Sequence, residues 1–139
     1  NNKKARIVPA KIVSPDETPD SSFPLILTTG RLLEHWHTGS MTSRSKVLST
    51  IEPQPYVNMS RNEMKKNNFS QDETVELSTR RGKVKVKVRI DKMIPDGMVF
   101  MPFCFENAPA NLLTNQALDP DGKIPELKYC AAKIQKSTA

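Results

Sequence analysis

The segment KVKVKVRI, Lys83–Ile90, decides the fold class of this 139-residue chain. Apolar and cationic side chains alternate along it, which predicts a strand with one buried face and one face in water. A register shift of one residue would bury four cations, so the pairing of this strand is strongly determined. The basic stripe could bind an anion, but alternating lysine is common where one face of an antiparallel strand is solvated. We interpret the stripe as structural, with a second role in blocking edge pairing.

Weaker strand signals lie on both sides of this segment. Residues 74–78 also alternate, and Arg80-Arg81-Gly82 then predicts a hairpin loop in which Gly82 can take a positive φ. Apolar runs predict further strands at residues 25–29, 56–59, 98–105 and 128–134, with the tail from residue 135 fraying. These segments make up most of the roughly seven short strands that the chain is expected to form.

Helix signals are fewer. Residues 60–63, SRNE, have the Ser-x-x-Glu form of a capping box and predict a helix that begins at Ser60. Its end is predicted at Asn67 or Asn68, since asparagine can take the left-handed conformation. Residues 43–51 predict a short helix or turn, stopped by Pro53 and Pro55. Many short strands with few helices indicate a mainly β chain that closes into a small barrel.

Length and charge restrict the organisation and the partners. The chain is long enough for one domain with a sizeable core. Residues 1–22 carry three prolines among polar residues and predict a linker, so the folded domain is expected over residues 23–139.

The net charge of +6 raises nucleic acid as a partner, but few aromatic residues accompany the cations, so bases have little to stack on. An anionic cofactor or an acidic neighbouring domain accounts for the charge equally well. A basic β-barrel module that binds nucleic acid or acidic protein stays as an alternative.

The two cysteines, Cys104 and Cys130, are far apart in the sequence. They form neither a zinc-site spacing nor a dense disulfide framework. No apolar run approaches the roughly 20 residues of a membrane helix. These features predict a reduced, cytoplasmic setting and no membrane span.

The richest chemistry lies in LTTGRLLEHWHTGSMT, residues 27–42, where a buried strand would emerge into a loop. This stretch holds both histidines and the only tryptophan. Its glycines allow close approach of backbone N–H groups, its threonines and serine supply hydroxyls, and Arg31 supplies a planar cation suited to phosphate. Such groups fit a nucleotide-like cofactor. The alternative is an ordinary loop whose rings are hydrogen-bonded by backbone carbonyls.

Residues 106–122 predict a long irregular loop, which we expect to be ordered because core strands flank it and leucines occur in it. Several asparagines and a glutamine in this loop can donate and accept hydrogen bonds at once, as a pterin edge requires. The alternative is that these amides serve turns.

Together with MPFCFENAPANLLTNQALDP at residues 101–120 and KIPELKYCAA at residues 123–132, the loop stretch resembles a known family. That family is the C-terminal molybdopterin-dinucleotide-binding domain of molybdenum or tungsten oxidoreductases, and the resemblance is closest to the formate dehydrogenase catalytic (alpha) subunit. It runs from about residue 19 to residue 134. The resemblance implies a double-psi β-barrel with one or two short helices, a topology that periodicity does not predict. Formylmethanofuran dehydrogenase, where a similar domain is a separate subunit, is the alternative, and the ALDP...KIPE pattern favours formate dehydrogenase.

In such enzymes the cofactor carries the hard chemistry, and the protein binds and orients it. The resemblance implies bis(molybdopterin guanine dinucleotide) with molybdenum or tungsten, held jointly with other domains that supply the metal ligand. It also implies an electron-transfer subunit as partner and formate oxidation to CO2 by the whole enzyme, with this domain inactive alone. Cys104 and Leu127 stand where the family often has a histidine and an aromatic residue, and we interpret Cys104 as a packed thiol rather than a metal ligand. The cofactor-binding residues that the resemblance implies are Thr29, Arg31, His35, Trp36, His37, Thr38, Ser40, Met41, Thr42, Asn111, Lys128 and Tyr129.

Overall fold

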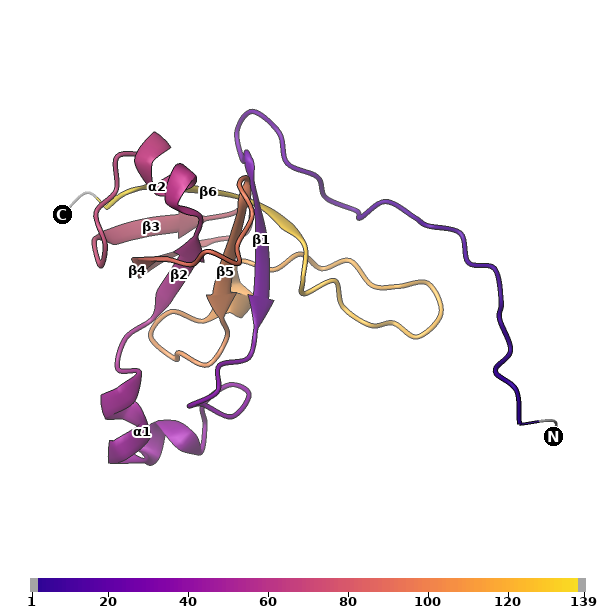
Figure 1. Ribbon diagram of the computed structural model, residues 1–139, viewed down its shortest axis with the longest axis horizontal. Coiled ribbons are helices and arrows are strands. Elements are labelled where there is room, and N and C mark those ends of the chain that lie inside the picture. The colour runs from indigo at the N-terminus through magenta and orange to yellow at the C-terminus, as the bar shows by residue number, and fades with distance from the viewer. Residues whose placement is uncertain (1–2, 138–139) are drawn as a thin grey trace.

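Residues 3–137 are described by the computed structural model, in which six strands close into one barrel (Figure 1). Around the barrel the strands follow the order β1 (Leu25–Gly30), β5 (Met98–Pro102), β2 (Tyr56–Met59), β4 (Lys83–Ile90), β3 (Thr74–Ser78) and β6 (Cys130–Lys136). β6 pairs with β1 and completes the ring. The β1–β5 and β2–β4 pairs are parallel, and the other four pairs are antiparallel. This mixed closed barrel confirms the mainly β class and the double-psi barrel that the resemblance implied.

The alternation in β4 has the predicted consequence. Val84, Val86 and Val88 are at most 7% exposed, whereas Lys83 and Lys85 on the other face are exposed. Apolar side chains from all six strands join the three valines in one core. Burial of these apolar side chains inside the closed barrel is what stabilises it.

The capping-box helix forms where predicted, as α2 (Arg61–Lys66). The Ser60 hydroxyl accepts a hydrogen bond of 3.1 Å from the Glu63 backbone N–H, which satisfies one free donor of the first turn. Asn68 follows the helix with a φ of 53°. The second predicted helix is α1 (Lys46–Ile51), and short 3-10 turns occur as η1 (Thr42–Arg44) and η2 (Ala110–Leu112). Figure 1 shows α1 beyond the end of the barrel toward which β1 and β5 point.

Several details of the predicted strands are wrong. The barrel has six strands rather than about seven. β6 begins at Cys130, and it continues through Lys136, where fraying was expected, because residues 135–136 pair with β3. β5 ends at Pro102, and residues 103–105 leave the ladder as part of a loop.

Gly82 also differs from prediction, since it does not have a positive φ. A Cβ at this position would lie 2.8 Å from the Leu112 carbonyl oxygen. Glycine is therefore required by the close approach of two backbone segments rather than by a left-handed conformation.

The segment before β1 has no helix or strand among its described residues, 3–24. Residues 3–13 extend away from the barrel and are exposed, with Ile7 at 95% and Ile12 at 96% (Figure 1). Within residues 3–137, no helix is long and apolar enough to cross a membrane.

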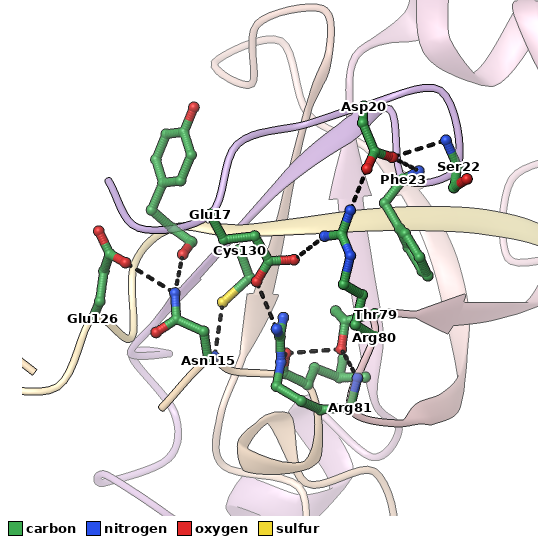
Figure 2. Close-up of polar contacts among 12 residues, drawn as sticks. Glu17, Asp20, Ser22, Phe23, Thr79, Arg80, Arg81, Asn115, Glu126 and Cys130 are labelled. Atoms are coloured by element: carbon green, nitrogen blue, oxygen red, sulfur yellow. Dashed lines mark hydrogen bonds and ion pairs between the residues drawn. The ribbon is translucent and has the colours of Figure 1, made fainter. Parts of the chain in front are cut away.

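The later part of this segment, residues 17–23, is fastened to the barrel, and we call it the strap. Figure 2 shows the Glu17 carboxylate between the guanidinium groups of Arg80 and Arg81, with Asp20 on the second edge of Arg80. The Arg81–Glu17 contact is 2.6 Å. The Phe23 ring lies under the Arg80 guanidinium, 4.9 Å from its centroid. These contacts hold the strap against the loop between β3 and β4.

Candidate functional site

Two loops meet at one end of the barrel. The β1 loop (residues 31–44) follows β1, and the β5 loop (residues 103–111) follows β5. Because β1 and β5 are parallel neighbours, both loops leave the barrel at the same end. Between them lies a cleft of about 610 Å³, lined by Thr38, Gly39, Ser40, Ser43, Arg44, Phe103, Cys104, Phe105, Glu106, Pro109, Ala110 and Asn111.

Gly39 brings the two loops together. Its φ is +78°, and a Cβ there would lie 2.4 Å from the Cys104 carbonyl oxygen. The Gly39 N–H donates to the Trp36 carbonyl at 2.9 Å, and His37 between them has a φ of 49°. This tight turn carries the hydroxyls of Thr38 and Ser40 to the cleft wall.

The floor of the cleft is a small apolar cluster outside the barrel core. Tyr56, Cys104 and Phe105 are buried in it, and Leu32 of the β1 loop packs against them. Burial raises the pKa of the Cys104 thiol to about 11, so the group is neutral near pH 7. The interpretation of Cys104 as a packed thiol is confirmed by its 4% exposure. Among residues 3–137, no group of three or more His, Cys, Asp and Glu side chains is placed to hold a metal ion.

His35 is buried, with 4% exposure, and both ring nitrogens have partners. Nε2 lies 3.2 Å from the Glu52 carbonyl oxygen, and Nδ1 lies 3.3 Å from the Thr42 hydroxyl. A carbonyl only accepts, so Nε2 carries a proton, and in the neutral ring Nδ1 accepts from Thr42. The ring also meets Phe105 edge-on, with centroids 5.9 Å apart. His35 thus secures the β1 loop, and its predicted contact with the cofactor stays a prediction.

The cleft contains three of the predicted cofactor-binding residues, Thr38, Ser40 and Asn111. The side chains of Trp36 and Met41, 64% and 75% exposed, lie on the same loop without lining the cleft. Arg31 is also exposed and outside the cleft lining. The rings of Trp36 and His37 contact edge-on, with centroids 4.4 Å apart.

The remaining predicted residues lie elsewhere. The Thr29 hydroxyl, on β1, donates to the Leu127 carbonyl at 2.7 Å, and the Lys128 ammonium donates to the Thr29 carbonyl at 2.5 Å. This pair ties the end of β1 to the segment before β6. Tyr129 lines a different hollow, of about 570 Å³, between residues 13–16 and residues 117–126.

Sequence reasoning missed three polar residues of the cleft: Ser43, Arg44 and Glu106. Arg44 is exposed in the last turn of η1, two residues beyond the end of the 27–42 stretch. Its planar cation is of the kind that binds phosphate. A longer window after Thr42 would have included it.

Comparison with known proteins agrees with this geometry. Residues 25–131 match the family described as "Molydopterin dinucleotide binding domain". The chain is 47% identical over 122 residues to F420-dependent formate dehydrogenase 1 subunit alpha of Methanococcus maripaludis, which covers 88% of this chain and 18% of the relative. It is 42% identical over 136 residues to F420-dependent formate dehydrogenase subunit alpha of Methanocaldococcus jannaschii, which covers 98% of this chain and 20% of the relative. The chain therefore spans about a fifth of the length of these curated relatives.

Among solved structures, acetylene hydratase from Pelobacter acetylenicus matches with a TM-score of 0.75 and 20% identity. The match covers 84% of this chain and 19% of that one, and it shows the shared fold. A family match over most of the chain, a barrel of the same fold and a cleft rich in hydroxyl, amide and guanidinium groups lead to one conclusion. The chain belongs to the molybdopterin dinucleotide-binding domain family.

Proposed function

We propose that this chain is the cofactor-binding domain of a formate dehydrogenase catalytic subunit. The observation that carries the proposal is 47% identity over 88% of the chain to a formate dehydrogenase alpha subunit. The whole enzyme would oxidise formate to CO2, and the names of the relatives favour coenzyme F420 as the electron acceptor. They also favour formate dehydrogenase over formylmethanofuran dehydrogenase.

The chemistry of the cleft fits a pterin dinucleotide. Arg44 offers a guanidinium, and Thr38, Ser40 and Ser43 offer hydroxyls, which together suit the oxygens of a pyrophosphate. The amide of Asn111 and the carboxylate of Glu106 can pair with the mixed donors and acceptors of a heterocycle. The cleft lining holds one cation, Arg44, one carboxylate, Glu106, and several neutral donors. A pyrophosphate there would therefore be bound by hydroxyls and a single guanidinium, without a run of basic residues.

These residues would bind and orient the cofactor rather than react. When bound, bis(molybdopterin guanine dinucleotide) with molybdenum or tungsten would supply the redox chemistry. Thr38, Ser40, Arg44 and Asn111 would hold its phosphate and ring parts, and the Lys128–Thr29 contact would maintain the end of β1 beneath the β1 loop. The other residues that the resemblance implies stay as proposed contacts: Thr29, Arg31, His35, Trp36, His37, Met41, Thr42, Lys128 and Tyr129.

The remaining partners are part of the same proposal. The rest of the catalytic subunit would complete the cofactor site and supply the metal ligand, so this domain alone would be inactive. An electron-transfer subunit would accept the electrons, and the complex would work in the cytoplasm. Nucleic acid is not a partner in this proposal, because Lys83 and Arg89 of the basic stripe are already paired with Glu76 and Glu52.

Titration of the 139-residue chain with inorganic pyrophosphate and with GDP tests the proposal. Backbone amide signals of Thr38, Ser40, Arg44 and Asn111 should shift before those of β4. Arg44→Gln should weaken pyrophosphate binding by about 1.5–3 kcal/mol, the usual value of a charge-assisted hydrogen bond. Arg61→Gln is the matched control, because Arg61 is an exposed arginine in α2 and lies outside the cleft lining. Shifts confined to β4 would favour a nucleic-acid-binding module, and a uniform response would mean unspecific charge attraction.

A further inference from the structure

Arg89 lies at the end of the basic face of β4, but its guanidinium is directed at protein groups. One nitrogen, Nη1, lies 3.0 Å and 2.8 Å from the two carboxylate oxygens of Glu52. The guanidinium carbon lies 4.0 Å from the centroid of the Tyr56 ring. The Arg89 and Glu52 side chains are only 28% and 18% exposed, so water screens their contact less than that of a surface pair. Arg89 therefore differs from the solvated lysines on the same face.

A chain of polar contacts leads from Arg89 to the β1 loop. Glu52 is the C-cap of α1, and its carbonyl accepts from His35 Nε2 at 3.2 Å. His35 Nδ1 lies 3.3 Å from the Thr42 hydroxyl. That hydroxyl in turn accepts from the Trp36 backbone N–H at 3.0 Å. The side chain of Glu52 thus faces β4 while its backbone faces the loop that borders the cleft.

A second route to the same histidine runs through aromatic rings. The Tyr56 ring under Arg89 meets Phe105 edge-on, with centroids 6.1 Å apart. Phe105 meets His35 edge-on at 5.9 Å. Tyr56 is 5% exposed although its strand neighbours Val57 and Met59 fill the barrel core, because Arg89 and the β5 loop cover it on the outside. Both routes start at Arg89 and end at His35.

We propose that Arg89 is a positioning residue for the β1 loop: it holds Glu52 and the Tyr56–Phe105 rings so that His35 keeps the loop in its cofactor-binding conformation. This role deepens the proposed function and rests on it, because the ligand of the cleft is a cofactor only if that function is correct. The physical basis is the population of the competent loop. If the loop is in this conformation only part of the time, the apparent dissociation constant equals the intrinsic constant divided by the fraction of molecules in that conformation.

Arg89→Gln tests the role of Arg89 in the free chain, before any ligand is added. Trp36, the only tryptophan, is part of the β1 loop and gives a signal from that loop alone. We expect a change in its fluorescence emission and anisotropy, with amide shifts at residues 32–42 and 52, while amides of the barrel core keep their positions. Lys87→Gln is the control, because Lys87 lies two residues earlier on the same face of β4 and should leave the Trp36 signal unchanged. If Arg89→Gln does not fold, Arg89→Lys keeps the charge while losing the flat guanidinium and should give the same local change in weaker form.

Binding of inorganic pyrophosphate provides the second measurement. Arg89→Gln should raise the dissociation constant roughly two- to thirty-fold, the range found for residues coupled to a site through a contact network. At saturation the loop amides should return to the wild-type bound positions, since the ligand selects the same conformation. Glu52→Gln should raise the dissociation constant by an equal or smaller factor. The double variant should be no worse than Arg89→Gln alone, because both changes break the Arg89–Glu52 contact and Arg89→Gln also removes the contact with the Tyr56 ring.

The outcomes separate the two proposals. If pyrophosphate leaves the wild-type amides of the cleft unshifted, the proposed function fails, while the Trp36 signal of free Arg89→Gln still decides the positioning role. If that signal and the loop amides match the wild type, or if shifts spread over the whole barrel, Arg89 is not a positioning residue for the loop. Additive effects of Arg89→Gln and Glu52→Gln would overturn the inference as well.

Discussion

Gly39 and Gly97 have the same left-handed backbone, with a φ of +78°, but different surroundings. Nothing lies within 4 Å of the Cβ position at Gly97, whereas at Gly39 the Cys104 carbonyl oxygen lies 2.4 Å away. Gly97 thus serves a turn, and Gly39 serves both a turn and the contact between two loops. At the scale of single residues, this pair separates the two reasons for which a chain uses glycine.

Gly97→Ala should therefore cost about 1–2 kcal/mol of unfolding free energy, the strain of a left-handed alanine. Gly39→Ala should cost more, because its Cβ must also displace the Cys104 backbone, and it should alter Trp36 fluorescence. Urea unfolding followed by circular dichroism gives both free energies. Equal costs for the two variants would mean that the loops separate without penalty and that the cleft is not held by this contact.

β4 shows at the scale of an element how one strand serves two environments. Its valines lie in the core, and its cations face outward, where Lys83 pairs with Glu76 at 3.0 Å and Arg89 pairs with Glu52. The strand is bordered by β2 on one side and β3 on the other, so its two edges are closed by backbone hydrogen bonds, and the predicted second role of the stripe in blocking edge pairing is wrong. The stripe is accordingly part of the outer wall of the barrel.

Charge reversal at Lys85 and Lys87 should leave the pyrophosphate response nearly unchanged, because neither residue lines the cleft. Val86→Asp should instead unfold the chain, with a loss above about 4 kcal/mol, because it buries an unpaired carboxylate. Amide spectra and pyrophosphate titration of the three variants provide the measurement. A large loss of pyrophosphate affinity in the lysine variants would show that the stripe binds anions after all.

The strap joins the barrel to the exposed residues 3–13, and its contacts link parts of the chain that are distant in the sequence. The Glu17 side chain is 13% exposed and meets both Arg80 and Arg81. Arg81 continues inward, where its Nε donates to the Leu113 carbonyl at 3.0 Å. Four segments distant in the sequence are thus linked, namely the strap, the loop between β3 and β4, the turn η2 and, through the Lys133–Phe23 contact, β6.

Glu17→Gln should release the strap while the barrel stays closed. We expect a loss of about 1–3 kcal/mol in the local opening free energy of residues 17–23, since the carboxylate is charge-bonded to two guanidinium groups. Native-state hydrogen exchange measures this directly. Asp16→Asn, a change at an exposed neighbour, is the control and should leave the exchange of these amides unaffected.

Acid should loosen the strap in the same way. Hydrogen bonds from the Phe23 and Ser22 backbone and the charge of Arg80 hold the pKa of Asp20 below its ordinary value of 3.8. A lowered folded-state pKa contributes stability above the unfolded value and loses it as the pH falls through the folded one. The protection of the amides of residues 17–23, measured relative to the intrinsic exchange rate at each pH, should thus fall below pH 3.8, before the barrel unfolds. If the strap and the barrel lost their amide protection at the same pH, the strap would not open as a unit separate from the barrel.

The sequence by itself determined the features that depend on near neighbours. Alternation over Lys83–Ile90 predicts the buried valines because side chains of a strand point alternately to its two faces. The Ser60–Glu63 spacing predicts the start of α2, since the cap acts across three residues. The resemblance of three motifs predicted the double-psi barrel and the family, and it included Thr38, Ser40 and Asn111 of the cleft.

Only the tertiary structure decided the pairings and the site. The strand order around the barrel, the parallel β1–β5 pair and the contact of Gly39 with Cys104 join residues far apart in the chain. Periodicity carries no signal for such contacts, because it describes faces and not neighbours. For the same reason Arg89 could not be told apart from the lysines beside it, since its partner Glu52 lies 37 residues away. The fold brings these groups together because closing the barrel is the arrangement that buries every apolar strand face at once.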